Sequence, residues 1–453
     1  MAERTSAHYL ALVRGAAQDA AELEQIYRQA VATGEERAFR EAVATVLQSG
    51  QRTPVLLAWG YRLDLLPLPA SGEMAPGRSA GGPSDPSRSW GPALAVSLGL
   101  GLLWTLLAGD QPPVPFPDAA RPLFWLGWAP ATGFAILAYL ALAGNPGVRE
   151  RRWLLAAGTL VALAALAGGL ARARTDDVAF LTAAHLPLAV VLALGVAVTG
   201  PADRPGAQWF PLLLKYAEVL LTAGVFAMAS GFLGALTMGI FAVLGIQIPD
   251  ATVERAAAFV LGTLPVLAVA SVYNPRAVPT GQDLTQGPLR LLRLFARLAL
   301  PAVAGVLVLY LFWFLPHHFW RGFQDRSLLL VYNLTVVTLL GLMALAVPTR
   351  DEAGTSPWLR RVLILTAFLT FLLNAYALAA NLSRVWHFGL TPNRHAVAGW
   401  NGVTLALLAA ILLGQVRATD RDWTERFAAA LVRFLPLLAG WVGWVLVASP
   451  FLW

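Results

Sequence analysis

Polar and ionisable side chains inside apolar stretches are the residues of this 453-residue sequence that could do chemistry. Lys215 and Glu218 lie three residues apart in the apolar block 209–248, a spacing that puts both on one face of a helix. Such an ion pair could be a proton or cation site, or an interfacial pair whose lysine reaches toward water. His185 could relay protons near neutral pH, or be a core histidine bonded to a carbonyl.

Three asparagines in later apolar stretches could line a polar path, or could hydrogen-bond neighbouring helices together: Asn333, Asn374 and Asn401. Patterns of catalysis and metal binding are missing from the sequence. It has no cysteine, no His-Glu-x-x-His or Gly-x-Ser-x-Gly pattern, and only one lysine, which excludes a P-loop. The sequence therefore favours a protein that is not an enzyme without deciding the question, and we expect no catalytic residue, no metal site and no cofactor.

The stretch 384–394 has the composition of a helix end followed by a helix start. Gly389 can take a positive φ and turn the chain. Thr391 can cap the next helix with its hydroxyl, and Pro392 suits the first helical position, where its missing N–H is no loss.

The same stretch holds a candidate contact for an anion or a lipid, formed by Arg384, Gly389, Thr391 and Arg394. Arg394 falls in the first turn of the predicted helix, where the positive end of the helix dipole repels a cation. We therefore expect an anionic partner for it, either a lipid phosphate or a carboxylate such as Asp325.

The elements that hold these residues are predicted to be transmembrane helices. Hydrophobic residues make up 57% of the chain and charged residues 13%, and the mean hydropathy is +0.61. These values predict an all-α, polytopic bundle in a lipid bilayer, with about 20 apolar residues per span. The eleven predicted spans are residues 91–108, 123–143, 153–170, 178–198, 209–248, 256–272, 295–315, 328–347, 362–380, 396–416 and 431–452.

The block 209–248 is long enough for two crossings, and the basic residues between spans favour one. With a single crossing, 16 basic residues lie on the side of the N-terminus and 8 on the other side, as the positive-inside rule demands. We expect a cytoplasmic N-terminus, an extracytoplasmic C-terminus, and a peripheral or re-entrant piece at residues 239–248.

The domain organisation follows from changes in composition along the chain. Residues 1–66 show helical periodicity and predict a small cytoplasmic helical segment, which could bind a protein partner or be a passive cap. Residues 67–90 are rich in Pro, Gly and Ser and predict a flexible linker. Residues 91–453 form the transmembrane domain. The net charge of +7 is spread over short loops, so we expect no nucleic-acid partner.

The loop from Arg384 to Arg394 resembles one in a family of bacterial multi-pass membrane proteins, domain of unknown function 4153. Its members carry an arginine followed by an aromatic-Gly-Leu-Thr-x-x-Arg loop between two late spans, which Phe388 to Arg394 matches here. The resemblance covers residues 92–416 loosely. It implies the fold and a bacterial inner membrane, and it brings no activity, substrate or catalytic residue.

Two functional hypotheses follow from the sequence, and a third, an enzyme that acts on a lipid-linked substrate at the outer face, ranks below both. The first is a transport-like protein with a polar path between helices, near Glu218, His185 and the asparagines. The second is a non-catalytic membrane scaffold or envelope-lipid sensor, whose N-terminal helices bind a partner. A hydrated cavity that reaches Glu218 would favour transport. Dry packing around Glu218, together with an exposed apolar face on residues 1–65, would favour the scaffold.

Overall fold

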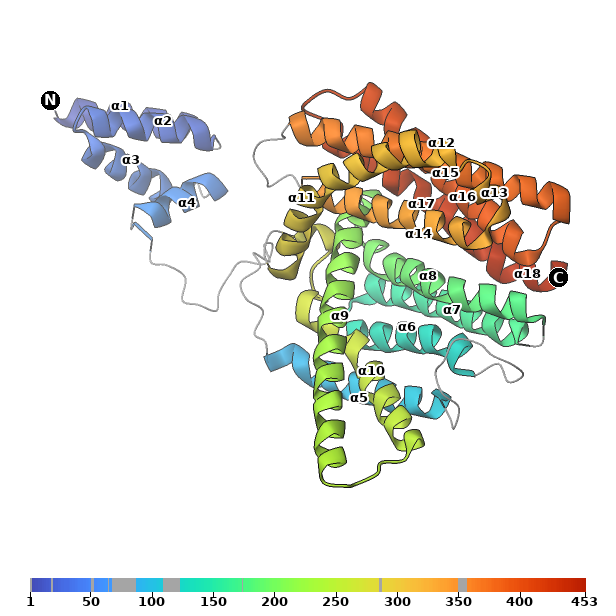
Figure 1. The fold of residues 1–453 in the computed structure, drawn as a ribbon. Coiled ribbons are helices and arrows are strands. Elements are labelled where there is room, and N and C mark those ends of the chain that lie inside the picture. The colour runs from blue at the N-terminus through green and yellow to red at the C-terminus, as the bar shows by residue number, and fades with distance from the viewer. Residues whose placement is uncertain are drawn as a thin grey trace. The chain divides into compact units, whose positions relative to one another are not determined.

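The structure is a computed structural model of the chain, and it describes residues 2–17, 19–49, 53–63, 65–66, 87–108, 123–172, 174–284, 287–348 and 357–453. The chain divides into two compact units, Met1–Ala80 and Gly81–Trp453, which we call the N-terminal unit and the membrane unit. All regular secondary structure within the described residues is helical (Figure 1). The predicted all-α fold is confirmed.

The N-terminal unit contains four helices: α1 (Ala2–Gly15), α2 (Ala20–Ala32), α3 (Glu36–Gln48) and α4 (Pro54–Arg62). This unit has a separate hydrophobic core. Leu23, Phe39 and Leu56 are 0% exposed and belong to one cluster of buried residues that lies entirely within the unit. Thr53 explains where α4 begins: its hydroxyl accepts from Leu56 N at 3.2 Å and donates to Ala17 O. The helical periodicity of residues 1–66 therefore marks a folded unit.

The described residues of the membrane unit include eleven helices that are long and apolar enough to cross a membrane, as the hydropathy predicted. The predicted linker 67–90 overlaps the first of them, since residues 87–90 begin α5; residues 67–86 lie outside the described residues. The long helices are α5 (Ser87–Ala108), α6 (Leu123–Gly144), α7 (Val148–Ala171), α8 (Asp176–Thr199), α9 (Pro205–Val243), α10 (Asp250–Val272), α11 (Gly287–Leu309), α14 (Arg326–Ala346), α15 (Pro357–Phe388), α16 (Pro392–Val416) and α17 (Trp423–Val447). Short pieces are the 3₁₀ turn η1 (Pro279–Gly281), the π-helical η2 (Tyr310–Phe314), α12 (Leu315–His317), α13 (Arg321–Gln324) and α18 (Ser449–Leu452).

Helix α9 is one uninterrupted helix of 39 residues, about 58 Å long at 1.5 Å per residue. The prediction that residues 239–248 form a separate peripheral piece is wrong, because Gly239 to Val243 continue α9 and only residues 244–249 form the turn to α10. Gly239 does not interrupt the helix, and Gly245, with a φ of 72°, follows its end. Figure 1 shows α9 running across the direction of α6, α7 and α8.

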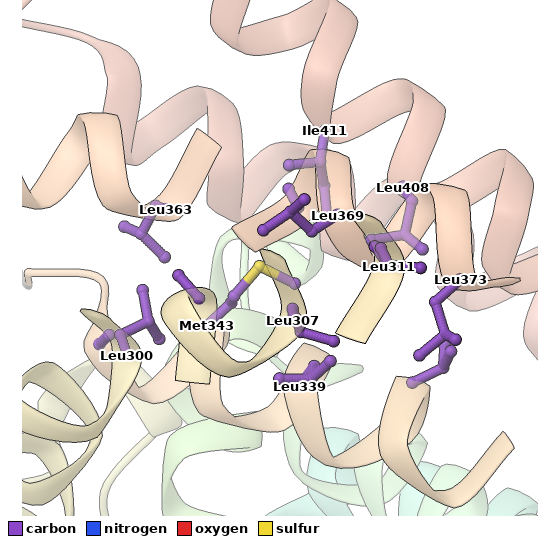
Figure 2. Close-up of a cluster of buried hydrophobic side chains, with 14 of the residues drawn as sticks. Leu300, Leu307, Leu311, Leu339, Met343, Leu363, Leu369, Leu373, Leu408 and Ile411 are labelled. Carbon is purple, nitrogen blue, oxygen red and sulfur yellow. The ribbon is translucent and has the colours of Figure 1, made fainter. Parts of the chain in front are cut away.

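The membrane unit has several apolar cores between helices. The largest joins α11, α14, α15 and α16, where Leu307, Met343, Leu369 and Leu408 converge (Figure 2). Met343 is 0% exposed, and its unbranched thioether fills the space among branched side chains. A second core joins α6, α7 and α8, and α5 packs closely along α10.

In their described residues, five connections or the helix ends beside them lie on one face of the membrane unit: α6–α7, α8–α9, α10–α11, α14–α15 and α16–α17. We call it the arginine-rich face. The α8–α9 and α10–α11 connections both lie there, so α9 runs away from this face and α10 runs back to it. This is the arrangement expected if α9 crosses the membrane once. The bonds that join these connections and the adjoining helix ends are Arg149 Nη1 to Asp203 Oδ1 (3.1 Å), Thr280 N to Gln208 Oε1 (3.0 Å), Arg276 Nε to Ala143 O (3.3 Å), Arg293 Nη2 to Val347 O (3.0 Å) and Arg360 Nη1 to Asp420 Oδ1 (2.7 Å).

Candidate functional site

Lys215 and Glu218 form a buried ion pair on α9, with Lys215 Nζ 2.7 Å from Glu218 Oε2 and side chains 5% and 4% exposed. Lys215 Nζ also donates to the carbonyl oxygen of Val272, the last residue of α10, at 3.1 Å. Gly287 lies against the carboxylate, since a Cβ there would be 3.4 Å from Glu218 Oε1. The pair is therefore covered by the end of α10 and the start of α11, close to the arginine-rich face.

His185 uses both ring nitrogens in hydrogen bonds within the protein. Nδ1 lies 2.7 Å from Leu181 O, and a carbonyl only accepts, so Nδ1 carries the proton. Nε2 accepts from Trp400 Nε1 at 2.7 Å. The histidine is thus a neutral link between α8 and α16. The interpretation of a core histidine bonded to a carbonyl is confirmed, and Trp400 is a partner that the sequence did not indicate.

Asn374 of α15 is bound to α16 one turn from that link. Its Nδ2 donates to Thr404 Oγ1 at 2.9 Å and to Asn401 O at 3.0 Å. Thr404 Oγ1 in turn donates to Trp400 O at 2.8 Å. We call His185, Trp400, Asn401, Thr404 and Asn374 the central polar cluster. It ties α8, α16 and α15 together, which is the role of interhelical hydrogen bonding in bilayers.

The other intramembrane candidates lie apart from this cluster. Within the described residues no hydrogen bond joins Lys215 or Glu218 to it. Asn333 Oδ1 of α14 is buried with no partner among those residues, as are Asn374 Oδ1 and Asn401 Nδ2 within the cluster. The structure brings together Asn374, Asn401 and His185, and it does not bring Glu218 or Asn333 to them.

The loop between α15 and α16 has the conformation that its residues predict. Gly389 has a φ of 78°, in the left-handed region that glycine adopts without steric cost. Thr391 is the N-cap of α16 and accepts from Arg394 N at 3.4 Å, and Pro392 is the first helical residue. These features confirm the predicted helix start.

The arginines of this loop bind carbonyls, and Asp325 is not the partner of Arg394, so that alternative is wrong, while a lipid phosphate stays a prediction. Arg394 Nη1 donates to Phe388 O at 2.8 Å and to Gly389 O at 2.7 Å, at the negative C-terminal end of α15. Arg384 Nη1 donates to Gln324 O at 3.1 Å. Hydrogen bonds from Ser327 lower the pKa of Asp325, and the charge of Arg384 lowers it further.

A cavity of about 660 Å³ opens at the arginine-rich face, between the α6–α7 turn, the end of α8 and the segment after α10. Neither Lys215 nor Glu218 lines it. Its lining residues include Leu140, Asn145, Glu150, Tyr273 and Arg276. Among the described residues, no group of three His, Asp or Glu side chains is placed to hold a metal ion.

Comparisons with known proteins add no relative. No family model, no curated protein and no solved structure matches this chain.

Proposed function

We propose that this protein is a non-catalytic membrane scaffold, in which the membrane unit anchors the N-terminal unit and the N-terminal unit binds a protein partner. The observation that carries the proposal is the separate core of the N-terminal unit. A passive cap would have no need of a core of its own, whereas a recognition module must hold its surface in one shape.

The described surface of the N-terminal unit does not have the exposed apolar face that we expected of a scaffold, so the contact with the partner that we propose is a polar one. Of its described large apolar residues, only Leu12, Val31 and Tyr61 are exposed. Arg62 is held in place, because its guanidinium lies 4.3 Å from the centre of the Trp59 ring and its Nη1 lies 2.5 Å from Glu24 Oε2. An ordered arginine on an aromatic ring suits a partner that presents carboxylates.

The closed environment of the intramembrane polar residues also supports a scaffold over a transporter. A transport site must exchange its ligand with water, yet Glu218 is 3% exposed and bound to Lys215. His185 has no nitrogen left for a proton relay. Transport stays the competing hypothesis. It requires that the reconstituted protein show proton-coupled flux and that this flux depend on Glu218.

The orientation of the chain is part of the proposal. The excess of basic residues on the arginine-rich face supports placing that face, and the N-terminal unit, in the cytoplasm. The resemblance of the loop at residues 384–394 to domain of unknown function 4153 supports a bacterial inner membrane as the location.

The test is a mild purification of the full chain from its native membrane, followed by mass spectrometry of the proteins that stay bound. A variant Phe39→Asp should lose the bound partner, because a carboxylate cannot replace a fully buried ring without unfolding the N-terminal unit. The double variant Lys215→Met/Glu218→Gln, which leaves no unpaired charge in the membrane unit, should keep the partner. A partner retained equally by Phe39→Asp would refute recognition by this unit, and proton-coupled flux that is abolished in the folded double variant would favour transport.

A further inference from the structure

The cavity at the arginine-rich face has walls that are already fixed by hydrogen bonds. Gln282 spans the segment after α10, donating from Nε2 to Asn274 O at 2.8 Å and to Ala277 O at 2.9 Å. Its Oε1 accepts from Asn274 N at 3.0 Å, and the side chain is 8% exposed. Gln208 of α9 holds the same segment through Thr280 N. This wall is therefore preformed, as ligand sites usually are.

The facing wall is the α6–α7 turn, which is held in an unusual conformation. Asn145 is the only non-glycine residue with a positive φ (50°) in the described part of the chain. Gly144 lets this turn approach the segment after α10, since a Cβ there would lie 3.1 Å from Pro275 O. The hydrogen bond from Arg276 Nε to Ala143 O joins the segment after α10 to the end of α6, so the two walls are linked directly.

The chemistry of the lining is that of a site for an amphipathic molecule with two charges. The interior is apolar, with Leu140, Leu154 and Val198 among the lining residues. Glu150 and Arg276 are exposed, line the same cavity and carry opposite charges. Neither has an ion-pair partner in the parts of the chain that the structure describes, so both charges are available to a ligand.

The place of the cavity in the fold decides what reaches it. It lies where α6 and α8 end and α7 begins, at the boundary between apolar helices and polar connections. Phospholipid head groups occupy this boundary in a membrane. The volume of about 660 Å³ falls in the range of small-ligand sites, roughly 300 to 1,000 Å³.

We propose that this cavity binds a zwitterionic aminophosphate head group, that of a phosphatidylethanolamine, with its ammonium on Glu150 and its phosphate on Arg276. A glycerol head group carries the same phosphate but no ammonium, so it would leave the charge of Glu150 without a counter-charge. A choline head group has the same charges but no N–H, so it cannot donate a hydrogen bond to the carboxylate. The site should therefore select ethanolamine over choline and over glycerol head groups.

The experiment is native mass spectrometry of the purified full chain, reconstituted in nanodiscs of equal parts phosphatidylethanolamine, phosphatidylcholine and phosphatidylglycerol. The wild-type chain should bind about ten times more phosphatidylethanolamine than either of the other two lipids. A tenfold ratio in affinity is what one charge-assisted hydrogen bond contributes. Glu150→Gln should abolish the preference for ethanolamine over choline. Arg276→Gln should weaken retention of both lipids.

Matched controls are Glu254→Gln and Arg417→Gln, which remove the same charges from residues outside the cavity. They should bind lipid as the wild type does. Soluble phosphoethanolamine distinguishes the source of the ligand, and it should compete only weakly because it lacks the apolar part that fills the interior. The proposal is overturned if Glu150→Gln and Arg276→Gln leave the lipid profile unchanged, or if soluble phosphoethanolamine binds and the lipid does not.

Discussion

The ion pair of Lys215 and Glu218 allows a quantitative test of whether these residues stabilise the fold. Their charged atoms are 2.7 Å apart and both side chains are at most 5% exposed. At an effective dielectric constant of 20, two unit charges at this distance attract by about 6 kcal/mol, part of which offsets the desolvation of both groups. Removing one partner leaves the other buried without a counter-charge, at a cost of about 3 to 5 kcal/mol.

We expect Lys215→Met and Glu218→Gln each to lower the free energy of unfolding by about 3 to 5 kcal/mol. The double variant Lys215→Met/Glu218→Gln should be within about 1 to 2 kcal/mol of the wild type, because no unpaired charge is left and the residues keep similar volumes. The measurement is unfolding of the purified full chain by dodecyl sulfate in mixed micelles, as a double-mutant cycle. If the losses of the single variants simply add in the double variant, the two residues are not coupled and the reasoning fails.

Three further predictions concern topology, a helix start and the central polar cluster. The chain has no cysteine, so a thiol reagent will label only the introduced residue in the single variants Asp203→Cys and Asn393→Cys. A reagent that does not cross the membrane should reach these two positions from opposite sides. Labelling of both from the same side would contradict the proposed crossings. Hydrogen bonds from Arg426 and Thr419 lower the pKa of Asp422 from 3.8 to about 2, so its stabilisation of the start of α17 is complete above pH 4 and is lost as the pH falls through 2. Hydrogen exchange at the start of α17 should accelerate in that window, and Asp422→Asn should remove the pH dependence. Trp400→Phe should cost about 1 kcal/mol of stability by leaving His185 Nε2 unpaired, while Trp441→Phe, whose Nε1 has no partner among the described residues, should cost less in the same unfolding assay.

Hydropathy was sufficient to predict the spans, because bilayer thickness imposes a length on every helix that crosses it. The start of α16 was also predictable from the sequence, because Gly389, Thr391 and Pro392 act through local backbone geometry. The prediction for the end of α9 overlooked a local signal, because Gly245, with a φ of 72°, and Pro249 follow the last helical residue, Val243, as is usual after a helix end.

The contacts of the candidate residues were less predictable than their helices. The pairing of Lys215 with Glu218 follows from helical spacing, which is local. The bond from Trp400 to His185 joins residues 215 positions apart, and only the packing of α8 on α16 creates it. The same holds for Arg394, whose partners are the carbonyls of a helix end rather than a charged side chain.

The outer part of the hairpin formed by α9 and α10 has an experimental consequence. Val225, Met228, Phe232 and Val243 are exposed, and side chains at Gly231 and Gly234 would meet open space. With so few protein neighbours, this segment depends on the surrounding acyl chains for its order. Extraction into small micelles should therefore loosen this hairpin before any other part of the membrane unit, and lipid nanodiscs are the better medium for studying it.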